Sequence, residues 1–298
     1  MKSKLLGLIL GAGVFAACAA GTDGNTGGGG SGAGNNTGGD PSTGGMPGMG
    51  GSGGGFIGNG GGGGVAEIPE VFGHSATTLY KLNPETKAVG VVANFKNCNT
   101  DVVDIALDGA SNMYATTYDG LYRVDKLNAT CTLINASDLY PNSLSFVPKG
   151  TLDPNEEALV GYKDDQYVRI DTNTGDILEI GGKWNNGYKS SGDIVSVKNG
   201  PTFLTVKDYD PNGTECHDCL VEINPANGQM IKNYHSIGFD QVFGAAFWAG
   251  SVYGFTNTGQ LFEIQIQNGL LQTNLINTPQ GLSFYGAGST TSAPPVPQ

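Results

Sequence analysis

The residue types best suited to chemistry are concentrated in one stretch, Lys207 to Cys219. Oxygen-bearing side chains stand at alternate positions near its start: Asp208, Asp210 and Asn212. Gly213 follows at the sixth position, as in the opening of a calcium-binding loop, where alternate oxygens converge on a hard cation. The twelfth position, where a bidentate glutamate is expected, holds Cys219, so Asp218 or Glu215 would have to substitute. Calcium is therefore the candidate cofactor, and a polar hairpin tip without a metal is the alternative.

The same stretch ends in two closely spaced cysteines, Cys216 and Cys219. This spacing suits a redox motif, half of a zinc site or a local disulfide. The sequence has no second Cys/His pair at zinc spacing, and a haem attachment motif would need a histidine where Leu220 stands. In an oxidising compartment such a pair is expected to form a disulfide.

The sequence does not assign catalytic residues. It contains three histidines, His74, His217 and His235, and none stands with a serine or cysteine in a pattern that indicates a nucleophile and its base. Carboxylates that are scattered along a chain can still meet in a fold, which one sequence cannot reveal. The net charge of −12 provides no basic patch for phosphates, so we expect no nucleic-acid partner.

The N-terminus has the features of an export signal. Two lysines precede an apolar run from Leu5 to Phe15, which is too short to span a membrane. The tetrapeptide Phe15-Ala16-Ala17-Cys18 resembles a bacterial lipobox, although its first residue is usually leucine. The resemblance implies a signal peptide over residues 1–17 and a lipidated Cys18 that anchors the protein to a membrane. Because alanine rather than aspartate follows, the implied destination is the outer membrane, on its periplasmic or surface side. A plain secretion signal is the alternative.

Residues 18–64 consist mostly of glycine, asparagine, serine and threonine. Such a segment cannot bury enough apolar surface to offset its loss of conformational entropy on folding. We therefore expect a disordered, glycine-rich tether between the lipid and the folded domain. The glycines do not indicate a phosphate-binding loop, because no strand, helix or Lys-Ser/Thr signature frames them.

A five-residue motif recurs five times in the remaining chain. Each copy has two apolar residues, a charged residue, an aliphatic residue and a polar residue. The copies are Leu79–Asn83, Leu121–Asp125, Tyr167–Asp171, Leu220–Asn224 and Leu261–Gln265. Most are followed by a turn signal and another strand-like segment. A period of roughly 40 to 50 residues, with strands and no helical repeat, indicates the blades of a β-propeller.

The motif is predicted to form the third strand of each four-stranded blade. Four blades fit between Val102 and Ile276. Three strand-like segments before them and one after them, Gly281–Gly286, would form a fifth blade in which the two chain ends close the ring. The sequence therefore predicts an all-β, five-bladed β-propeller over residues 65–287 and a disordered tail over residues 288–298. The domain resembles bacterial propellers of the YVTN and NHL kind, which implies an architecture and no catalytic motif.

In such a blade, the loop between the second and third strands lies on the same face as the loop that leads to the next blade. One long loop on this face, Gly181 to Gly192, combines aromatic and amide side chains, which suit the recognition of a sugar or peptide. The candidate binding residues on this face are Trp184, Asn186, Tyr188, Tyr140 and Asp240. The alternative for Trp184 is packing between neighbouring blades. Phe243 and Trp248 alternate with small residues on a strand, so we expect them in the core.

Two further cysteines fall on neighbouring outer strands. Cys98 follows the last strand of the closing blade, and Cys131 lies on the last strand of the next blade. A disulfide between them would fasten the ring near its seam. The four cysteines beyond Cys18 would then all be paired, as Cys98–Cys131 and Cys216–Cys219.

These features favour a cell-envelope lipoprotein whose propeller is a non-catalytic binding or scaffold module for an envelope protein or glycan. The main alternative is an extracytoplasmic propeller enzyme, a lyase or hydrolase acting on polysaccharide or peptide. An enzyme should show carboxylates or histidines converging at the mouth of the axial channel. A scaffold should show a channel filled by apolar or small side chains.

Overall fold

The computed structural model describes residues 67–297, which fold into twenty β-strands. The predicted signal peptide, Cys18 and the tether over residues 18–64 lie outside the described residues. Within residues 67–297, no helix is long and apolar enough to cross a membrane.

The strands form five antiparallel sheets of four strands each. Blade 1 contains β4 (Val102–Leu107), β5 (Met113–Thr117), β6 (Gly120–Asp125) and β7 (Thr130–Ala136). Blade 2 contains β8 (Ser143–Val147), β9 (Ala158–Lys163), β10 (Gln166–Ile170) and β11 (Ile177–Glu179). Blade 3 contains β12 (Tyr188–Ser196), β13 (Thr202–Asp208), β14 (Cys219–Ile223) and β15 (Met230–Ser236). Blade 4 contains β16 (Val242–Trp248), β17 (Ser251–Thr256), β18 (Leu261–Gln267) and β19 (Leu270–Ile276). The closing blade contains β20 (Gly286–Ser289), β1 (Val71–His74), β2 (Thr78–Leu82) and β3 (Val89–Asn94), in that order.

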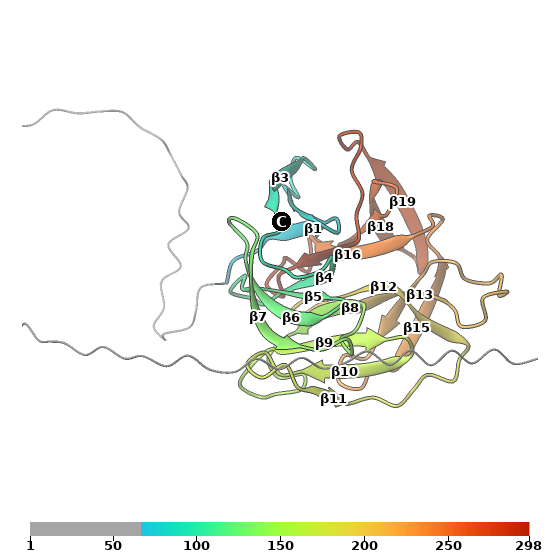
Figure 1. Ribbon diagram of the computed structural model, residues 1–298. Helices are drawn as coiled ribbons and strands as arrows, with labels where there is room; N and C mark the ends of the chain where they lie inside the picture. The colour runs from blue at the N-terminus through green and yellow to red at the C-terminus, as the bar shows by residue number, and fades with distance from the viewer. Residues whose placement is uncertain (1–66, 298) are drawn as a thin grey trace, which may run out of the picture. The chain divides into compact units, whose positions relative to one another are not determined.

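The fold is a five-bladed β-propeller, as predicted (Figure 1). The repeated motif forms the third strand of every blade, namely β2, β6, β10, β14 and β18. Its apolar residues are buried and its charged residue is more exposed, as in Gly120–Asp125, because successive side chains of a strand point to opposite faces.

The core is divided among the five junctions between neighbouring blades. One cluster joins Tyr162 of blade 2 to Leu204 of blade 3, and another joins Phe203 of blade 3 to Phe262 of blade 4. The remaining three clusters join the closing blade to blade 1, blade 4 to the closing blade, and blade 1 to blade 2. Each blade is therefore stabilised mainly by its two neighbours.

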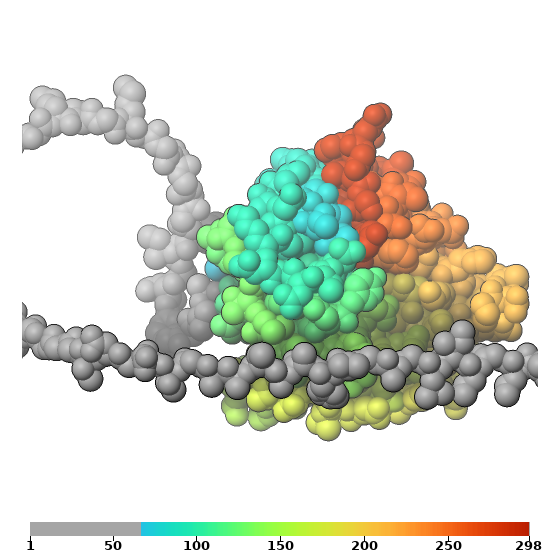
Figure 2. All heavy atoms as spheres, viewed as in Figure 1, coloured from blue at the N-terminus to red at the C-terminus, as the bar shows by residue number. Residues whose placement is uncertain are grey.

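The two ends of the described chain close the ring, as predicted. Strand β1 pairs with β20, with Val71 opposite Ser289 and His74 opposite Gly286. In Figure 2 the cyan and red surfaces of these segments meet. The predicted strand Gly281–Gly286 is wrong in position, because the inner strand begins where that segment ends. The crowded axis of the ring requires the small residues from Gly286 to Ser289, whereas the bulkier Phe284 packs between blade 4 and the closing blade.

The predicted disordered tail is also wrong for its described part. Residues Thr290 to Pro297, which we call the C-terminal strap, follow β20 and cross the ends of the inner strands. Thr290, Thr291 and Ala293 are buried. The Thr291 hydroxyl donates a 2.5 Å hydrogen bond to Glu157, and the Ala249 amide donates a 2.8 Å hydrogen bond to the Pro294 carbonyl. The strap is ordered because it covers backbone and side chains that would otherwise be exposed at this end of the axis.

Both predicted disulfides are present. Cys98 is bonded to Cys131, with their Cα atoms 5.3 Å apart, and Cys216 is bonded to Cys219, with their Cα atoms 5.6 Å apart. The Cys98–Cys131 disulfide links the closing blade to its neighbour in the ring, blade 1.

Candidate functional site

The inner strands β4, β8, β12, β16 and β20 surround the axis of the propeller, and two carboxyl groups lie between them. Asp104 on β4 and Asp193 on β12 are both completely buried. We call them the axial acid pair. A buried carboxyl group needs hydrogen-bond donors to offset the loss of water.

Backbone amides supply these donors to the axial acid pair. Asp104 accepts hydrogen bonds from the amides of Ile105 (2.8 Å) and Leu144 (2.6 Å), the second of which lies on β8. Asp193 accepts hydrogen bonds from the amides of Ile194 (2.7 Å) and of Ala245 on β16 (2.8 Å). Each carboxyl group therefore links its own inner strand to the next one around the ring.

Two glycines make room for the axial acid pair. Gly286 is the first residue of β20, and Gly244 is the third residue of β16. A Cβ atom on Gly286 would overlap Asp104 and the ring of His74, and one on Gly244 would lie 2.7 Å from the backbone of Gly286. Gly286 therefore leaves room for Asp104, and Gly244 allows β16 and β20 to approach each other beside the axial acid pair.

Burial controls the ionisation of this cluster. It raises the pKa of the Asp104 carboxyl, which the adjacent Asp193 raises further, and it also raises the pKa of Asp193. The pair therefore favours a shared proton over two negative charges. Burial lowers the pKa of His74 to about 4, so its ring, with Nε2 3.8 Å from an Asp104 oxygen, is neutral near pH 7.

A pocket of about 300 Å³ opens at the axis, just beyond the axial acid pair. We call it the axial pocket. Its lining residues are Val103, Tyr118, Asn142, Ser191, Gly192, Phe243, Asn257 and Tyr285. Six of these residues lie within an inner strand or directly before one, and Tyr118 and Asn257 follow the second strands β5 and β17, so every blade contributes to the pocket. It lies on the predicted working face, where chain segments lead into the inner strands.

The lining of the axial pocket is aromatic and polar but carries no charged side chain. Tyr118 is 64% exposed, whereas Ser191 is only 7% exposed. Burial raises the pKa of the nearby Asp218, and a hydrogen bond from the Ser191 hydroxyl acts in the opposite direction. The Ser191 hydroxyl thus interacts with Asp218 behind the wall of the pocket, which offsets part of the free-energy cost of burying both groups.

Two of the predicted binding residues are instead part of the blade junctions. Trp184 is buried, packs on Tyr162 and donates a 2.8 Å hydrogen bond to the Gly228 carbonyl. Tyr140 is buried as well and donates a 2.8 Å hydrogen bond to the Gly175 carbonyl. The prediction that they form a binding rim is wrong, because the apolar rings gain more by packing between blades than by facing water.

The other predicted binding residues do not reach the axial pocket. Asn186 is exposed and accepts a 3.2 Å hydrogen bond from the Tyr188 amide. Tyr188 begins β12 and packs against the core between blades 2 and 3. Asp240 is exposed in the segment before β16. The structure thus disperses these three residues around the pocket rather than bringing them together.

The structure does not bring the four predicted calcium ligands together. Asp208 accepts hydrogen bonds from the amides of Glu215 and Cys216, both 3.0 Å, and Asp210 accepts one from Asn212. Asp218 is buried and accepts a 3.3 Å hydrogen bond from the Val242 amide of blade 4. Within residues 67–297, no three acidic, histidine or cysteine side chains are grouped to hold a metal ion. The oxygens shape the turn instead, which is the alternative given above.

Several functional residues were not found from the sequence. The axial acid pair and the pocket residues Tyr118, Asn142 and Tyr285 carry no motif. A weak signal exists for the acids, since Asp104 is the one charged residue of β4 and Asp193 is the one charged residue in the buried part of β12. Phe243, expected in the core, lines the pocket, whereas Trp248 does pack partly against the core.

No known protein family matches the chain, and no curated protein matches it. Similar solved structures include a protein of unknown function from Bacteroides caccae, with 12% identity and a TM-score of 0.39 over 74% of this chain and 98% of that chain. A gluconolactonase from Xanthomonas campestris has 12% identity and a TM-score of 0.44 over 72% of this chain and 76% of that chain. BamB from Moraxella catarrhalis has 13% identity and a TM-score of 0.30 over 68% of this chain and 71% of that chain. The likeness is one of fold alone.

Proposed function

We propose that the protein is a cell-envelope lipoprotein that displays its propeller as a non-catalytic binding module, with the axial pocket as its ligand site. The observation that carries this proposal is the chemistry of the pocket. Aromatic rings and neutral hydrogen-bonding groups are open to solvent, while the acidic groups at the axis are buried beneath them.

The pocket favours a neutral glycan residue as the ligand. Tyr118, Phe243 and Tyr285 offer aromatic area for the apolar face of a sugar, and Asn142 and Asn257 offer hydrogen bonds to its hydroxyl groups. A charged ligand would find no counter-charge in the lining. The volume of about 300 Å³ is at the small end of ligand pockets, which suits one or two sugar rings.

The same geometry argues against the rival hydrolase or lyase. A general acid or base must lie within hydrogen-bond reach of the reacting atom, directly or through one water. Asp104, Asp193 and His74 converge at the axis, but they are fully buried and the two carboxyl groups are occupied by backbone amides. These groups support the walls of the pocket rather than facing its contents.

The anchoring half of the proposal rests on the lipobox-like tetrapeptide that ends in Cys18. A lipid on this cysteine would hold the binding module at the outer membrane, on its periplasmic or surface side. Wild-type chain should then partition with membranes, and the Cys18→Ser chain should appear in the soluble fraction. Equal partitioning of the two chains would contradict the anchor.

The soluble Cys18→Ser chain also serves for the binding test. Isothermal titration with neutral oligosaccharides isolated from envelope material should give a saturable signal. Tyr118→Ala should weaken binding at least about tenfold, which is about 1.4 kcal/mol. Because Tyr118 is largely exposed, this substitution should leave the melting temperature unchanged.

Tyr209→Ala is the matched control, since Tyr209 is also exposed but lies outside the axial pocket. Unchanged affinity in Tyr118→Ala, or an equal loss in both variants, would overturn the axial site. Release of shortened oligosaccharides during the titration would overturn the non-catalytic function. Binding only to an envelope protein would replace the glycan by a protein partner.

A further inference from the structure

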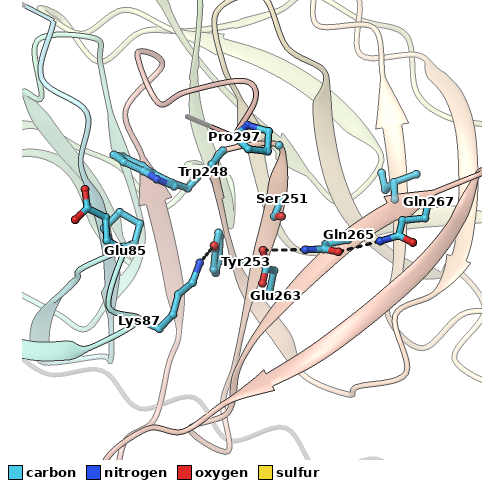
Figure 3. A pocket seen from close by; sticks show the side chains of 13 residues that line it. Glu85, Lys87, Trp248, Ser251, Tyr253, Glu263, Gln265, Gln267 and Pro297 are labelled. Carbon is cyan, nitrogen blue, oxygen red and sulfur yellow. Dashed lines mark hydrogen bonds between the residues drawn. The ribbon is translucent and has the colours of Figure 1, made fainter.

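A second cavity, of about 660 Å³, lies on the opposite face of the propeller, between blade 4 and the closing blade (Figure 3). We call it the inter-blade pocket. It is bordered by the turn between β16 and β17, by the turn between β2 and β3, and by the outward face of β18. These turns lie on the face that the C-terminal strap crosses, and Pro297 of the strap is part of the wall. The inter-blade pocket shares no residue with the axial pocket.

One wall of the inter-blade pocket is a row of polar side chains. Glu263, Gln265 and Gln267 alternate along β18 and therefore share one face of the strand. Gln267 donates a 3.1 Å hydrogen bond to Gln265, and Gln265 donates a 3.4 Å hydrogen bond to Glu263 (Figure 3). The amide and carboxylate groups are thereby held in an ordered line that offers both donors and acceptors.

The row continues into the closing blade through Lys87. The Lys87 ammonium group donates a hydrogen bond to the Tyr253 hydroxyl, and it lies 4.3 Å from the centre of the Tyr253 ring. Burial lowers the pKa of Lys87, although the charge of Glu263 acts in the opposite direction. The lysine therefore adds a fixed, partly desolvated donor at one end of the row.

The position of Lys87 departs from the repeat. The turn between the third and fourth strands ends in a residue with positive φ in each of four blades, and this residue is Lys87, Ala129, Gly175 or Gly228. Lys87 has a φ of 61°, a conformation that costs an ordinary side chain roughly 1 kcal/mol or more relative to glycine. Glycine or alanine suffices for the turn elsewhere, so the turn itself does not explain the lysine.

The facing wall is apolar. The indole of Trp248 is partly exposed and lies across the pocket from the polar row, with Pro297 nearby (Figure 3). An aromatic plane opposite a line of amide, carboxylate and ammonium groups is the arrangement that a sugar ring needs, with its apolar face on the indole and its hydroxyls on the polar row.

We propose that the inter-blade pocket is a second binding site, which takes a short segment of a neutral polysaccharide. The mixed charges select this class of ligand. An anionic chain would face the carboxylates of Glu85 and Glu263, and a simple cation would face Lys87. A polyol can use donors and acceptors together. The site stands on its own residues and not on the axial pocket, and two sites on opposite faces would let one molecule bridge two glycan chains.

The test uses the full-length Cys18→Ser chain and the neutral hexasaccharides maltohexaose, cellohexaose and chitohexaose as probes. Binding is followed by isothermal titration and by the fluorescence of Trp248, one of two tryptophans, the other being the buried Trp184. At least one hexasaccharide should give a saturable change. Lys87→Gly, which installs the residue found in the same turn of other blades, and Gln265→Ala should each weaken binding about tenfold or more.

Gln272→Ala is the matched control, because Gln272 is the exposed neighbour of Gln265 on β19 and does not line the pocket. Its affinity for the hexasaccharide, followed by the fluorescence of Trp248, should equal that of the parent chain. Loss of binding in Tyr118→Ala but not in Lys87→Gly would overturn this second site and leave the axial one intact. No saturable change with any of the three probes at about 10 mM, well above ordinary weak affinities, would also overturn it.

Discussion

The backbone amides of Leu144 and Ala245 point toward the axis of the ring, where no further strand can accept their hydrogen bonds. The inner strands are edge strands of their sheets, and an unpaired buried amide costs about as much free energy as a lost hydrogen bond. Asp104 and Asp193 supply the missing acceptors. The axis of this ring therefore holds two carboxyl groups rather than apolar side chains because the backbone amides that face it need acceptors.

The shared proton of the axial acid pair gives a testable pH dependence. Because burial raises both pKa values above the ordinary value, the folded protein binds a proton more tightly than the unfolded chain. The contribution of the pair to the free energy of unfolding therefore falls as the pH rises above about 4, by at most about 1.4 kcal/mol per pH unit for one proton. Asp104→Asn keeps a donor toward Asp193 and has no proton to lose. The difference in melting temperature between Asp104→Asn and the parent should therefore shift in favour of Asp104→Asn as the pH is raised from about 5 to about 8.

Thermal melts followed by circular dichroism at several pH values check this expectation. The lowered pKa of His74 has the opposite sign, since it removes stability as the pH falls from 6.5 toward 4; because His74 touches Asp104, the comparison is decided above pH 6.5, where this ring is neutral in both proteins. Asp138→Asn, at an exposed position, is the control. Parallel curves for Asp104→Asn and the parent would show that the pair holds no extra proton.

Single strands and their pairing were largely predictable from the sequence, whereas the sites between blades were not. The motif around Leu121–Asp125 was placed correctly because its apolar and charged residues alternate within one strand. Tyr118, Asn142 and Tyr285 come from three different blades, and only the closure of the ring brings them together. The sequence leaves Trp184 open between a binding role and packing between blades for the same reason, because its partners Tyr162 and Gly228 belong to two blades.

The disulfide between Cys98 and Cys131 joins the segment after β3 of the closing blade to β7, the outer strand of blade 1. Its cysteines are 33 residues apart in sequence, and those of the other disulfide are 3 apart. A crosslink that closes a longer loop removes more conformational freedom from the unfolded chain. Replacing both Cys98 and Cys131 by serine should therefore cost about 3 to 4 kcal/mol, against about 2 kcal/mol for Cys216 and Cys219.

Denaturant unfolding of the two double variants measures these costs. The longer-loop variant should have the lower midpoint, and both should refold to the same circular dichroism spectrum as the parent. A lower midpoint for the Cys216→Ser and Cys219→Ser variant would mean that the local disulfide holds the blade 3 loop against blade 4 more strongly than chain entropy suggests, through Asp218 and Val242.

The whole molecule is a ring whose first and last described segments share one blade, so its stability depends on contacts between the two ends. Strand β20 supplies the inner strand of that blade, and the C-terminal strap continues from it across the turns of blades 1 to 4. The strap touches Gly109 of blade 1, Glu157 of blade 2, Lys198 of blade 3 and Ala249 of blade 4. One short segment thus ties the closing blade to all the others.

The strap should accordingly stabilise the ring far more than its length suggests. A chain that ends at Ser289 loses the burial of Thr291 and Ala293 and leaves the half-buried Glu157 without its hydroxyl donor. We expect a loss of roughly 2 to 4 kcal/mol and a fall in melting temperature of about 5 to 15 °C for a domain of this size.

A chain that ends at Pro295 is the control, because it keeps the strap contacts and removes residues such as Val296, which is 64% exposed. Its melting temperature should stay within about 1 °C of the parent. If both truncated chains melted like the parent, pairing of β20 with β1 alone would be sufficient to close the ring. If both melted equally low, the exposed end of the strap would have to make contacts that burial does not reveal. If the melting temperature falls only for the chain that ends at Ser289, the buried part of the strap stabilises the ring that β20 closes.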